Sequence, residues 1–193
     1  FMEQLTSKAA GMTVGDPNHP KTRLGAIVSK GQHERVLSYI EAGIEQGATL
    51  RTGGQAATVD GRGYFIEATV FDDVKPDMTI AREEIFGPVL ATLAFEDLDD
   101  AVAQANQTIY GLAAGVWTRD VGKAHRFARA VRAGTVWVNT YRSASFMSPF
   151  GGFKHSGYGK HNGMEGIREF SRLKNVVVDF SGKTQDPFVM KLK

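Results

Sequence analysis

Glu83-Glu84-Ile85-Phe86-Gly87-Pro88 is the stretch around which the chain is organised, and it continues directly into the apolar segment Val89–Phe95. Its proline lacks a backbone donor and biases the preceding glycine away from helical angles. The stretch therefore predicts a fixed turn that leads into a buried strand and displays Glu84 and Phe86. A carboxylate accepts hydrogen bonds from paired hydroxyls such as those of a ribose, and an aromatic ring packs against a flat ring. The alternative is a solvated corner.

Composition restricts the classes of protein to which the chain can belong. Its 193 residues are 42% hydrophobic, enough for one core, and 23 basic and 21 acidic side chains give a net charge of +2. The basic residues form no stripe, so we expect neither a nucleic-acid nor a membrane partner. There is no cysteine, and the five histidines lack metal-ligand spacing, so we expect no disulfide and no metal site. No apolar run reaches the roughly 18 residues of a membrane span, and no signal peptide is visible, which favours the cytoplasm.

Hydrophobic periodicity predicts five helices. They are expected at residues 1–10, 30–46, 98–105, 121–132 and 163–170. Ser29, Asp97 and Asp120 stand where N-cap residues are expected. In the second helix the inward-facing residues are expected to be Val36, Leu37, Ile40 and Ile44.

Apolar runs rich in β-branched and aromatic residues predict strands between these helices. The strands are expected at residues 49–51, 64–71, 89–95, 112–118, 135–139 and 175–180. A polar loop is expected over residues 53–63. Because near-continuous apolar strands alternate with helices, the chain is predicted to be an α/β protein with a parallel sheet whose strands are buried.

Four more motifs stand in order around the opening stretch: Met78–Arg82 before it, and Tyr110–Val116, Ala133–Asn139 and Ser148–Gly157 after it. Together the five resemble the C-terminal part of the NAD(P)-dependent aldehyde dehydrogenase superfamily, over most of residues 11–180. The resemblance implies that family's parallel-sheet α/β catalytic domain with a C-terminal oligomerisation strand.

The same resemblance divides the chain into two regions. Residues 1–145 are expected to form the C-terminal part of the catalytic domain. Residues 146–193 are expected to end that domain with the oligomerisation strand, Val176–Phe180, and a tail. A late apolar strand has an unpaired edge, which proteins usually cover, so a homo-oligomer joined through this strand is expected.

The resemblance also implies a cofactor site. The glutamate that matches Glu84 binds the hydroxyls of the nicotinamide ribose, and the aromatic that matches Phe86 packs beside the nicotinamide. The cofactor is therefore expected to be NAD or NADP. The alternative for Glu84 is a buried carboxylate that caps the turn at Gly87, whereas Glu83 is expected to be structural.

Two residues are expected to contact the aldehyde substrate. The aromatic that matches Phe150 lines the family's substrate tunnel, although a packed turn is an alternative reading of this residue. Arg142 lies in a loop where many relatives carry apolar residues, and it indicates an anionic or polar aldehyde, because guanidinium binds carboxylates bidentately. The alternative is a solvated arginine. Asn139 is expected to bond the backbone of its own loop.

The activity implied is oxidation of an aldehyde to a carboxylic acid through a cysteine thiohemiacetal and a thioester. Since this chain has no cysteine, the resemblance places the catalytic Cys, the general-base Glu and the oxyanion Asn upstream of residue 1. No catalytic residue is assigned here, and the fragment alone is expected to be inactive. The alternatives are a CoA-acylating relative and a non-catalytic oligomerisation module.

Overall fold

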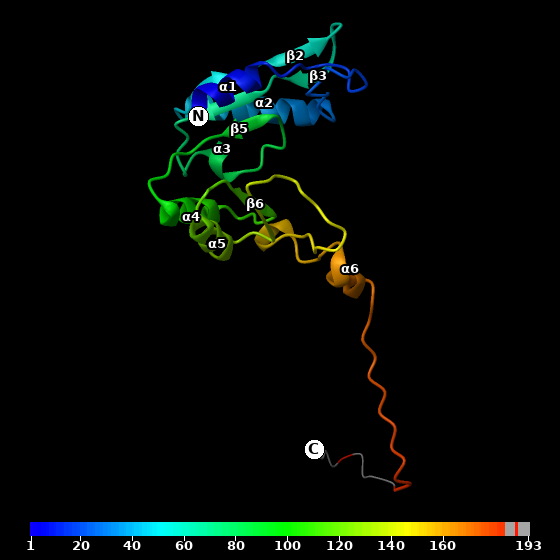
Figure 1. Ribbon diagram of the computed structural model, residues 1–193. Helices are drawn as coiled ribbons and strands as arrows, with labels where there is room; N and C mark the ends of the chain where they lie inside the picture. The colour runs from blue at the N-terminus through cyan, green and yellow to red at the C-terminus, as the bar shows by residue number, and fades with distance from the viewer. Residues whose placement is uncertain (184–187, 189–193) are drawn as a thin grey trace.

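The computed structural model describes residues 1–183 and 188, in which helices alternate with short strands (Figure 1). The helices are α1 (Met2–Ala10), α2 (Lys30–Glu45), α3 (Thr79–Arg82), α4 (Leu98–Gln107), α5 (Val121–Ala130) and α6 (Gly163–Glu169), with a 3-10 turn η1 (Lys154–Ser156). The strands are β1 (Thr49–Thr52), β2 (Ala56–Val59), β3 (Arg62–Ile66), β4 (Thr69–Asp72), β5 (Val89–Ala91), β6 (Ala113–Val116) and β7 (Thr135–Val138).

Parallel pairing joins two pairs of strands, which confirms the predicted α/β class. In the sheet of order β1-β4-β5, the pair β4–β5 is parallel, with Thr69 opposite Val89. In the second sheet β6 and β7 are parallel, with Ala113 opposite Thr135. The fold is mixed rather than purely parallel, because β1 joins β4 in the antiparallel sense and β2–β3 is an antiparallel hairpin.

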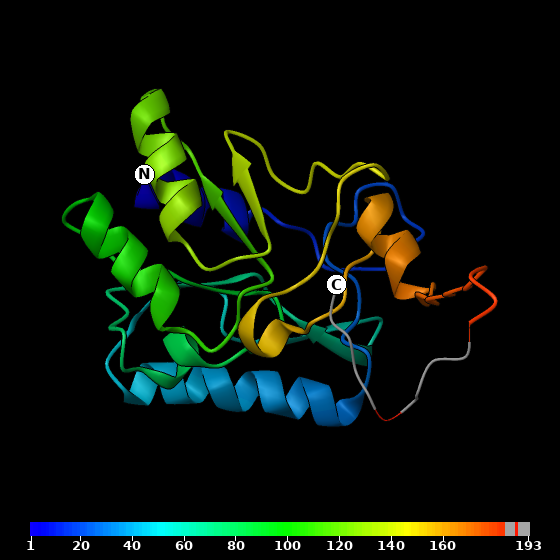
Figure 2. The ribbon, with the colours of Figure 1, turned by 90° about the horizontal axis from the view of Figure 1, so that it is seen from below.

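The elements form successive groups along the molecule. Figure 1 shows α1, α2 and strands β2 and β3 at one end, with α4, α5 and β6 beyond β5 and α3, followed by α6 and the extended segment after it. Seen from below in Figure 2, α2 runs along one side of the molecule, and α4 and α5 lie away from it. The predicted boundary at residues 145 and 146 falls in the loop between β7 and η1 and stays a prediction.

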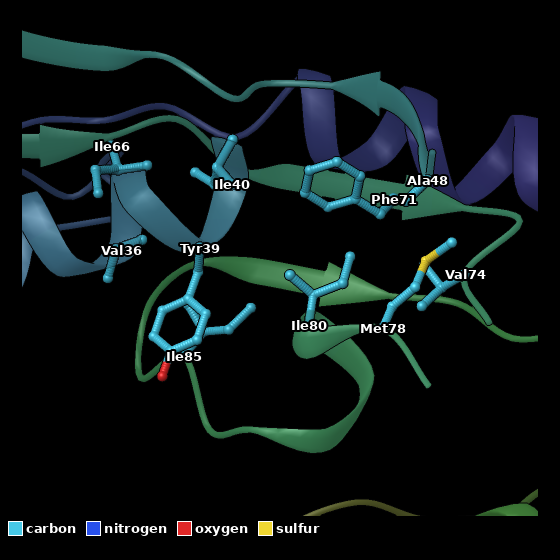
Figure 3. Packing of buried hydrophobic residues seen from close by; sticks show 10 residues of the cluster. All are labelled: Val36, Tyr39, Ile40, Ala48, Ile66, Phe71, Val74, Met78, Ile80 and Ile85. Carbon is cyan, nitrogen blue, oxygen red and sulfur yellow. The ribbon is translucent and has the colours of Figure 1, made fainter. Parts of the chain in front are cut away.

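The hydrophobic core lies between α2 and the β1-β4-β5 sheet (Figure 3). Phe71 and Val36 are fully buried there. A Cβ atom on Gly43 would lie 2.9 Å from Ile80 Cδ1, so the glycine permits α2 to pack closely. The predicted inward face of α2 is wrong at Ile44, which is 50% exposed, because the buried stripe runs through Tyr39 and Gly43 instead.

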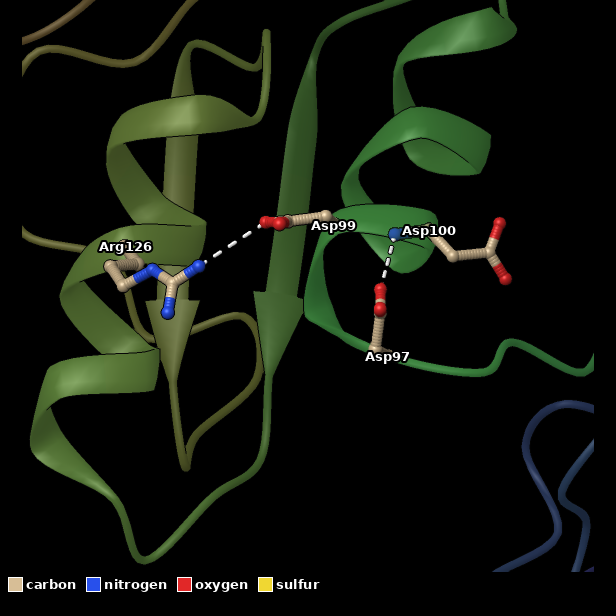
Figure 4. A network of polar contacts seen from close by, with 4 residues as sticks. All are labelled: Asp97, Asp99, Asp100 and Arg126. Carbon is tan, nitrogen blue, oxygen red and sulfur yellow. Dashed lines mark hydrogen bonds and ion pairs between the residues drawn. The ribbon is translucent and has the colours of Figure 1, made fainter.

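The three predicted N-caps are confirmed. The Oγ of Ser29 accepts a hydrogen bond from the Gln32 N–H at 3.2 Å, and Asp97 and Asp120 accept equivalent bonds at 2.9 Å. Figure 4 shows Asp97 at the start of α4, together with the ion pair between Asp99 and Arg126 that links α4 to α5. That pair is exposed, so it adds little stability.

The single strand predicted over residues 64–71 is wrong, because the chain forms two strands in different sheets. The Thr69 hydroxyl donates to the Glu67 carbonyl and accepts from the Gly54 N–H, both at 2.9 Å, which breaks the strand between β3 and β4. The predicted loop 53–63 contains β2, which turns back into β3 through Asp60 and Gly61, both at positive φ. An Asp-Gly pair is typical of a hairpin turn, so this hairpin could have been predicted from the sequence.

The predicted burial of residues 112–118 and 135–139 is wrong, although both strands form. β6 alternates between exposed and half-buried residues, and Trp117 just after it is exposed. A two-stranded sheet leaves much of its surface uncovered, and full burial of parallel strands requires helices on both faces.

The predicted strand over residues 175–180 is not formed. The segment is extended and leaves the rest of the chain (Figure 1), and its apolar side chains Val176, Val177, Val178 and Phe180 are 62–91% exposed. A strand needs a hydrogen-bonded neighbour, and no residue that the structure describes provides one.

The expected tail 181–193 lies mostly outside the described residues. No described helix is long and apolar enough to cross a membrane.

We expect Phe71→Ala to lower the free energy of unfolding by about 3–5 kcal/mol, because it removes a fully buried ring and leaves a cavity. Urea denaturation followed by circular dichroism measures the change. The matched control is Phe170→Ala, since that ring is exposed, and its expected change is within about 0.5 kcal/mol. Equal effects of the two substitutions would contradict the placement of the core.

Candidate functional site

The turn at residues 83–88 buries Ile85 and leaves Glu84 and Phe86 exposed on either side of it. Ile85 is buried in the core, whereas Glu84 is exposed and Phe86 is 75% exposed. Phe86 has φ of 56°, in the left-handed region. That backbone costs a residue other than glycine about 1–3 kcal/mol, so the surroundings must hold it.

Close packing against α2 fixes the position of the turn. A Cβ atom on Gly87 would lie 2.7 Å from both methyl carbons of Val36, so only glycine fits here without displacement. The carbonyl of Pro88 accepts from the Thr69 N–H at 2.8 Å, which joins the turn to the start of β4. The turn is therefore held both by the helix and by the sheet.

Polar side chains of α2 also contact the turn. Glu83 Oε2 accepts from the Tyr39 hydroxyl at 2.8 Å, and Arg35 Nη2 donates to the same hydroxyl at 2.9 Å. The hydrogen bond to Glu83, followed by burial, raises the pKa of Tyr39 above its ordinary value of 10.0. Gln32 Nε2 donates to the carbonyls of Ile85 and Phe86 at 3.1 and 3.2 Å. The structural role expected of Glu83 is confirmed by its bond to Tyr39.

The sequence interpretation missed Gln32, Arg35 and Tyr39. Gln32 and Tyr39 flank the buried Val36 at spacings of four and three residues, which places all three on one side of a helix. That spacing could have indicated a shared contact. It could not have identified the turn as the partner, because the contacts join positions 44 to 54 residues apart.

The Glu84 carboxylate has no hydrogen bond or ion pair with any residue in the described part of the chain. The alternative of a buried carboxylate that caps the turn is therefore wrong, since Glu84 is exposed. An available carboxylate beside an exposed phenyl ring matches the chemistry of a sugar diol joined to a flat ring. The structure thus displays the two predicted cofactor residues on one rigid turn.

Arg142 and Phe150 line the same open cavity of about 560 Å³. Its lining residues are Thr135, Trp137, Arg142, Ser143, Ala144, Ser145, Ser148, Pro149, Phe150 and Asn162. None of these described residues is acidic, and Arg142 is the one among them that carries a charge. Glu84 and Phe86 are not part of this lining.

The cavity wall is held by backbone and aromatic contacts. Phe150 exchanges two backbone hydrogen bonds with His161, both 2.8 Å long. Trp137 Nε1 donates to the Ser143 carbonyl at 2.8 Å, and its ring meets the Tyr141 ring edge-on, with the centroids 5.5 Å apart. Phe150 thus belongs to a bridged turn, is half-buried rather than in the core, and lines the cavity. Its contact with the substrate stays a prediction.

Asn139 has a structural role, as expected, but its partner differs from the prediction. Its Oδ1 accepts from the Thr118 N–H at 2.8 Å and its Nδ2 donates to the Thr118 carbonyl at 2.9 Å. The side chain therefore joins the ends of β6 and β7 rather than its own loop.

Over residues 1–183 and 188, no group of three acidic or histidine side chains could hold a metal ion.

Comparison with known proteins places this geometry in context. A sequence profile of the aldehyde dehydrogenase family matches residues 1–176. The betaine aldehyde dehydrogenase of Brucella anthropi is 46% identical over 190 residues, which are 97% of this chain and 39% of that protein. The enzyme of the same name from Agrobacterium fabrum is 49% identical over 189 residues, 97% of this chain and 38% of that protein. The chain therefore spans about two fifths of the length of these relatives.

Solved structures agree with the sequence comparison. The NAD⁺ complex of an aldehyde dehydrogenase from Bacillus cereus has a TM-score of 0.89 and 42% identity, covering 93% of this chain and 36% of that one. A Staphylococcus aureus betaine aldehyde dehydrogenase variant in complex with NAD⁺ has a TM-score of 0.92 and 32% identity, covering 98% of this chain and 39% of that one.

We expect Tyr39→Phe to destabilise the chain by about 2 kcal/mol at neutral pH, because it removes two hydrogen bonds, the one donated to Glu83 and the one accepted from Arg35. Since the folded state raises the pKa of Tyr39, this contribution is complete below about pH 10 and is lost as the pH rises through the folded-state pKa. Urea unfolding between about pH 8 and pH 11 should show the difference from the parent chain shrinking. Tyr158→Phe, at an exposed ring, is the control, and a pH-independent difference for Tyr39→Phe would contradict the linkage.

Proposed function

The chain belongs to the aldehyde dehydrogenase family, and from this we propose that it forms part of an NAD(P)-dependent enzyme that oxidises an aldehyde to a carboxylic acid. The single observation that carries the proposal is the turn that displays Glu84 and Phe86, in which the Glu84 carboxylate has no partner among the residues that the structure describes. The chain has no cysteine, so the attacking thiolate must come from the part of the family's length that these residues do not span. On this proposal the chain alone does not catalyse the reaction.

The proposed cofactor site consists of Glu84 and Phe86. The Glu84 carboxylate accepts hydrogen bonds from the two hydroxyls of the nicotinamide ribose, and the Phe86 ring packs beside the nicotinamide. The cofactor, when bound, accepts a hydride from the substrate. The contribution of the chain is to hold that cofactor at reactive distance and orientation. Two related structures described as NAD⁺ complexes support the cofactor class, and the choice between NAD and NADP stays open.

The proposed substrate site is the cavity that contains Arg142 and Phe150. Two relatives are named for betaine aldehyde, which carries a quaternary ammonium group. Arg142 would repel such a cation, because no acidic residue among the described lining residues offsets its charge. A carboxylate is bound bidentately by guanidinium. We therefore favour an aldehyde that carries an anionic or polar group, with Phe150 packing against its carbon chain.

The proposed assembly is a cytoplasmic homo-oligomer. Val176–Phe180 is exposed and extended, with apolar side chains that have no cover from the described residues. A second copy that pairs with this segment would satisfy its backbone groups and bury those side chains. The exposure of these apolar side chains is the observation that supports the proposed oligomer.

We expect Glu84→Gln in the active enzyme to lower kcat about 10- to 100-fold, because a neutral amide holds the ribose hydroxyls less firmly than a carboxylate. Steady-state kinetics with saturating NAD⁺ and aldehyde measure the effect. Glu45→Gln, at an exposed position at the end of α2, is the charge-matched control and should retain its rate. An unchanged kcat with unchanged cofactor affinity in Glu84→Gln would contradict the role of this residue.

We expect Arg142→Gln to raise the KM for a carboxylate-bearing aldehyde about 10- to 100-fold, because the charge-assisted hydrogen bonds are lost. The KM for an uncharged aldehyde of similar length should change less than about threefold. Comparing succinic semialdehyde with butanal measures the difference, and Arg129→Gln on the exposed side of α5 is the control. Equal changes for both aldehydes would show that Arg142 is only a solvated residue.

A further inference from the structure

We propose that Gln32 is a positioning residue for hydride transfer, which acts by fixing the two peptide units on either side of Phe86. This inference rests on the proposed function of the turn at residues 83–88. Gln32 touches neither cofactor nor substrate in this scheme. Its side-chain amide reaches from α2 to the backbone of the turn.

The two hydrogen bonds of Gln32 are well suited to this role. Nε2 carries two protons, one for each carbonyl, and it lies 3.1 Å from the Ile85 oxygen and 3.2 Å from the Phe86 oxygen. The two carbonyls belong to the peptide units on either side of the Phe86 Cα, so one group that holds both restrains the backbone angles of Phe86. Those angles decide where the Phe86 ring points, and φ is 56°, in the left-handed region.

The use of this amide differs from what the local sequence predicts. Ser29 and Gln32 have the spacing of a capping box, in which the glutamine at the third helical position bonds back to the N-cap N–H. Here the Ser29 half of the box is present, with a 3.2 Å bond from the Gln32 N–H. The side-chain amide of Gln32 is bonded to the turn instead. The backbone of Gln32 is thus bonded to Ser29 at the start of α2, and its side-chain amide donates to the turn.

The other two anchors of the turn act at different points. Tyr39 holds the Glu83 carboxylate, before the displayed residues. The contact between Val36 and Gly87 fixes the chain after them. Gln32 holds the intervening backbone at the Ile85 and Phe86 carbonyls. Losing it frees that backbone to rotate and loosens the adjoining Gly87 and Pro88 carbonyls, while the Tyr39 bond to Glu83 stays in place.

Gln46 provides a matched control on the same helix. It lies at the opposite end of α2 and also bridges to a separate element, accepting from the Thr79 N–H at 2.7 Å and donating to Thr79 Oγ1 at 2.8 Å. It therefore anchors the start of α3 rather than the turn. Gln46→Ala removes an equivalent link without touching residues 83–88.

The first arm of the test is amide hydrogen exchange of the chain in Gln32→Glu, Gln32→Lys and Gln46→Ala. Gln32→Glu keeps the size and removes both donors, whereas Gln32→Lys restores a donor. We expect exchange of the Val89 and Thr69 amides, which bond to the Gly87 and Pro88 carbonyls, to be about tenfold faster in Gln32→Glu. Gln32→Lys should return within about threefold of the parent, and Gln46→Ala should affect Thr79 instead.

The second arm is steady-state kinetics of the same variants in the active enzyme. Gln32→Glu should lower kcat about tenfold and leave the KM for the aldehyde unchanged, because orientation of the cofactor is lost and substrate contacts remain. Gln32→Lys should recover most of the rate. Gln46→Ala should retain it.

The outcomes separate this inference from the proposed function. An active enzyme whose kcat is unchanged in Gln32→Glu overturns the positioning role and leaves the proposed function intact. Exchange rates at Val89 and Thr69 that do not change in Gln32→Glu also overturn it. Absence of aldehyde dehydrogenase activity in the parent enzyme overturns the proposed function, and the positioning role with it.

Discussion

The contact between Val36 and Gly87 sets the distance between α2 and the turn, and the arrangement of the candidate site depends on it. Both methyl groups of the valine occupy the space that a side chain at position 87 would need. The core and the site are therefore not separate parts of the molecule. The same helix face that buries Val36 also bonds the turn through Gln32 and Tyr39. Packing in the interior thereby determines which side chains of the turn face outward.

Local signals in the sequence were sufficient for all the described α-helices except the short α3, which was not predicted. Ser29, Asp97 and Asp120 cap their helices through bonds to residues three positions away, so the information lies within one helical turn. The strands were harder to predict, because pairing depends on distant residues. The hydroxyl of Thr69 separates two strands that an apolar run had suggested were one. Residues 175–180 have strand composition but find no pairing partner among the described residues.

The candidate site shows the same division between local and distant information. The motif at residues 83–88 sufficed to identify Glu84 and Phe86 as displayed residues, because a Gly-Pro turn restricts its own backbone. Glu83, which accepts a bond from Tyr39, and Glu84, which has no partner in the described part of the chain, are adjacent in sequence. The packing of α2 distinguishes their roles. Arg142 and Phe150 were selected for separate reasons, and the structure places them in the wall of one cavity.

The anchors at the two ends of α2 limit how the length of this helix can change. Gln32 contacts the turn after α3, and Gln46, at the end of the helix, contacts the start of α3. A helix rotates by about 100° per residue, so inserting or deleting one residue between them would turn one anchor away from its partner. Substitutions on the exposed face of α2 leave both contacts in place. The helix therefore tolerates variation in composition far better than variation in length, and insertions should be found in the loops on either side of it.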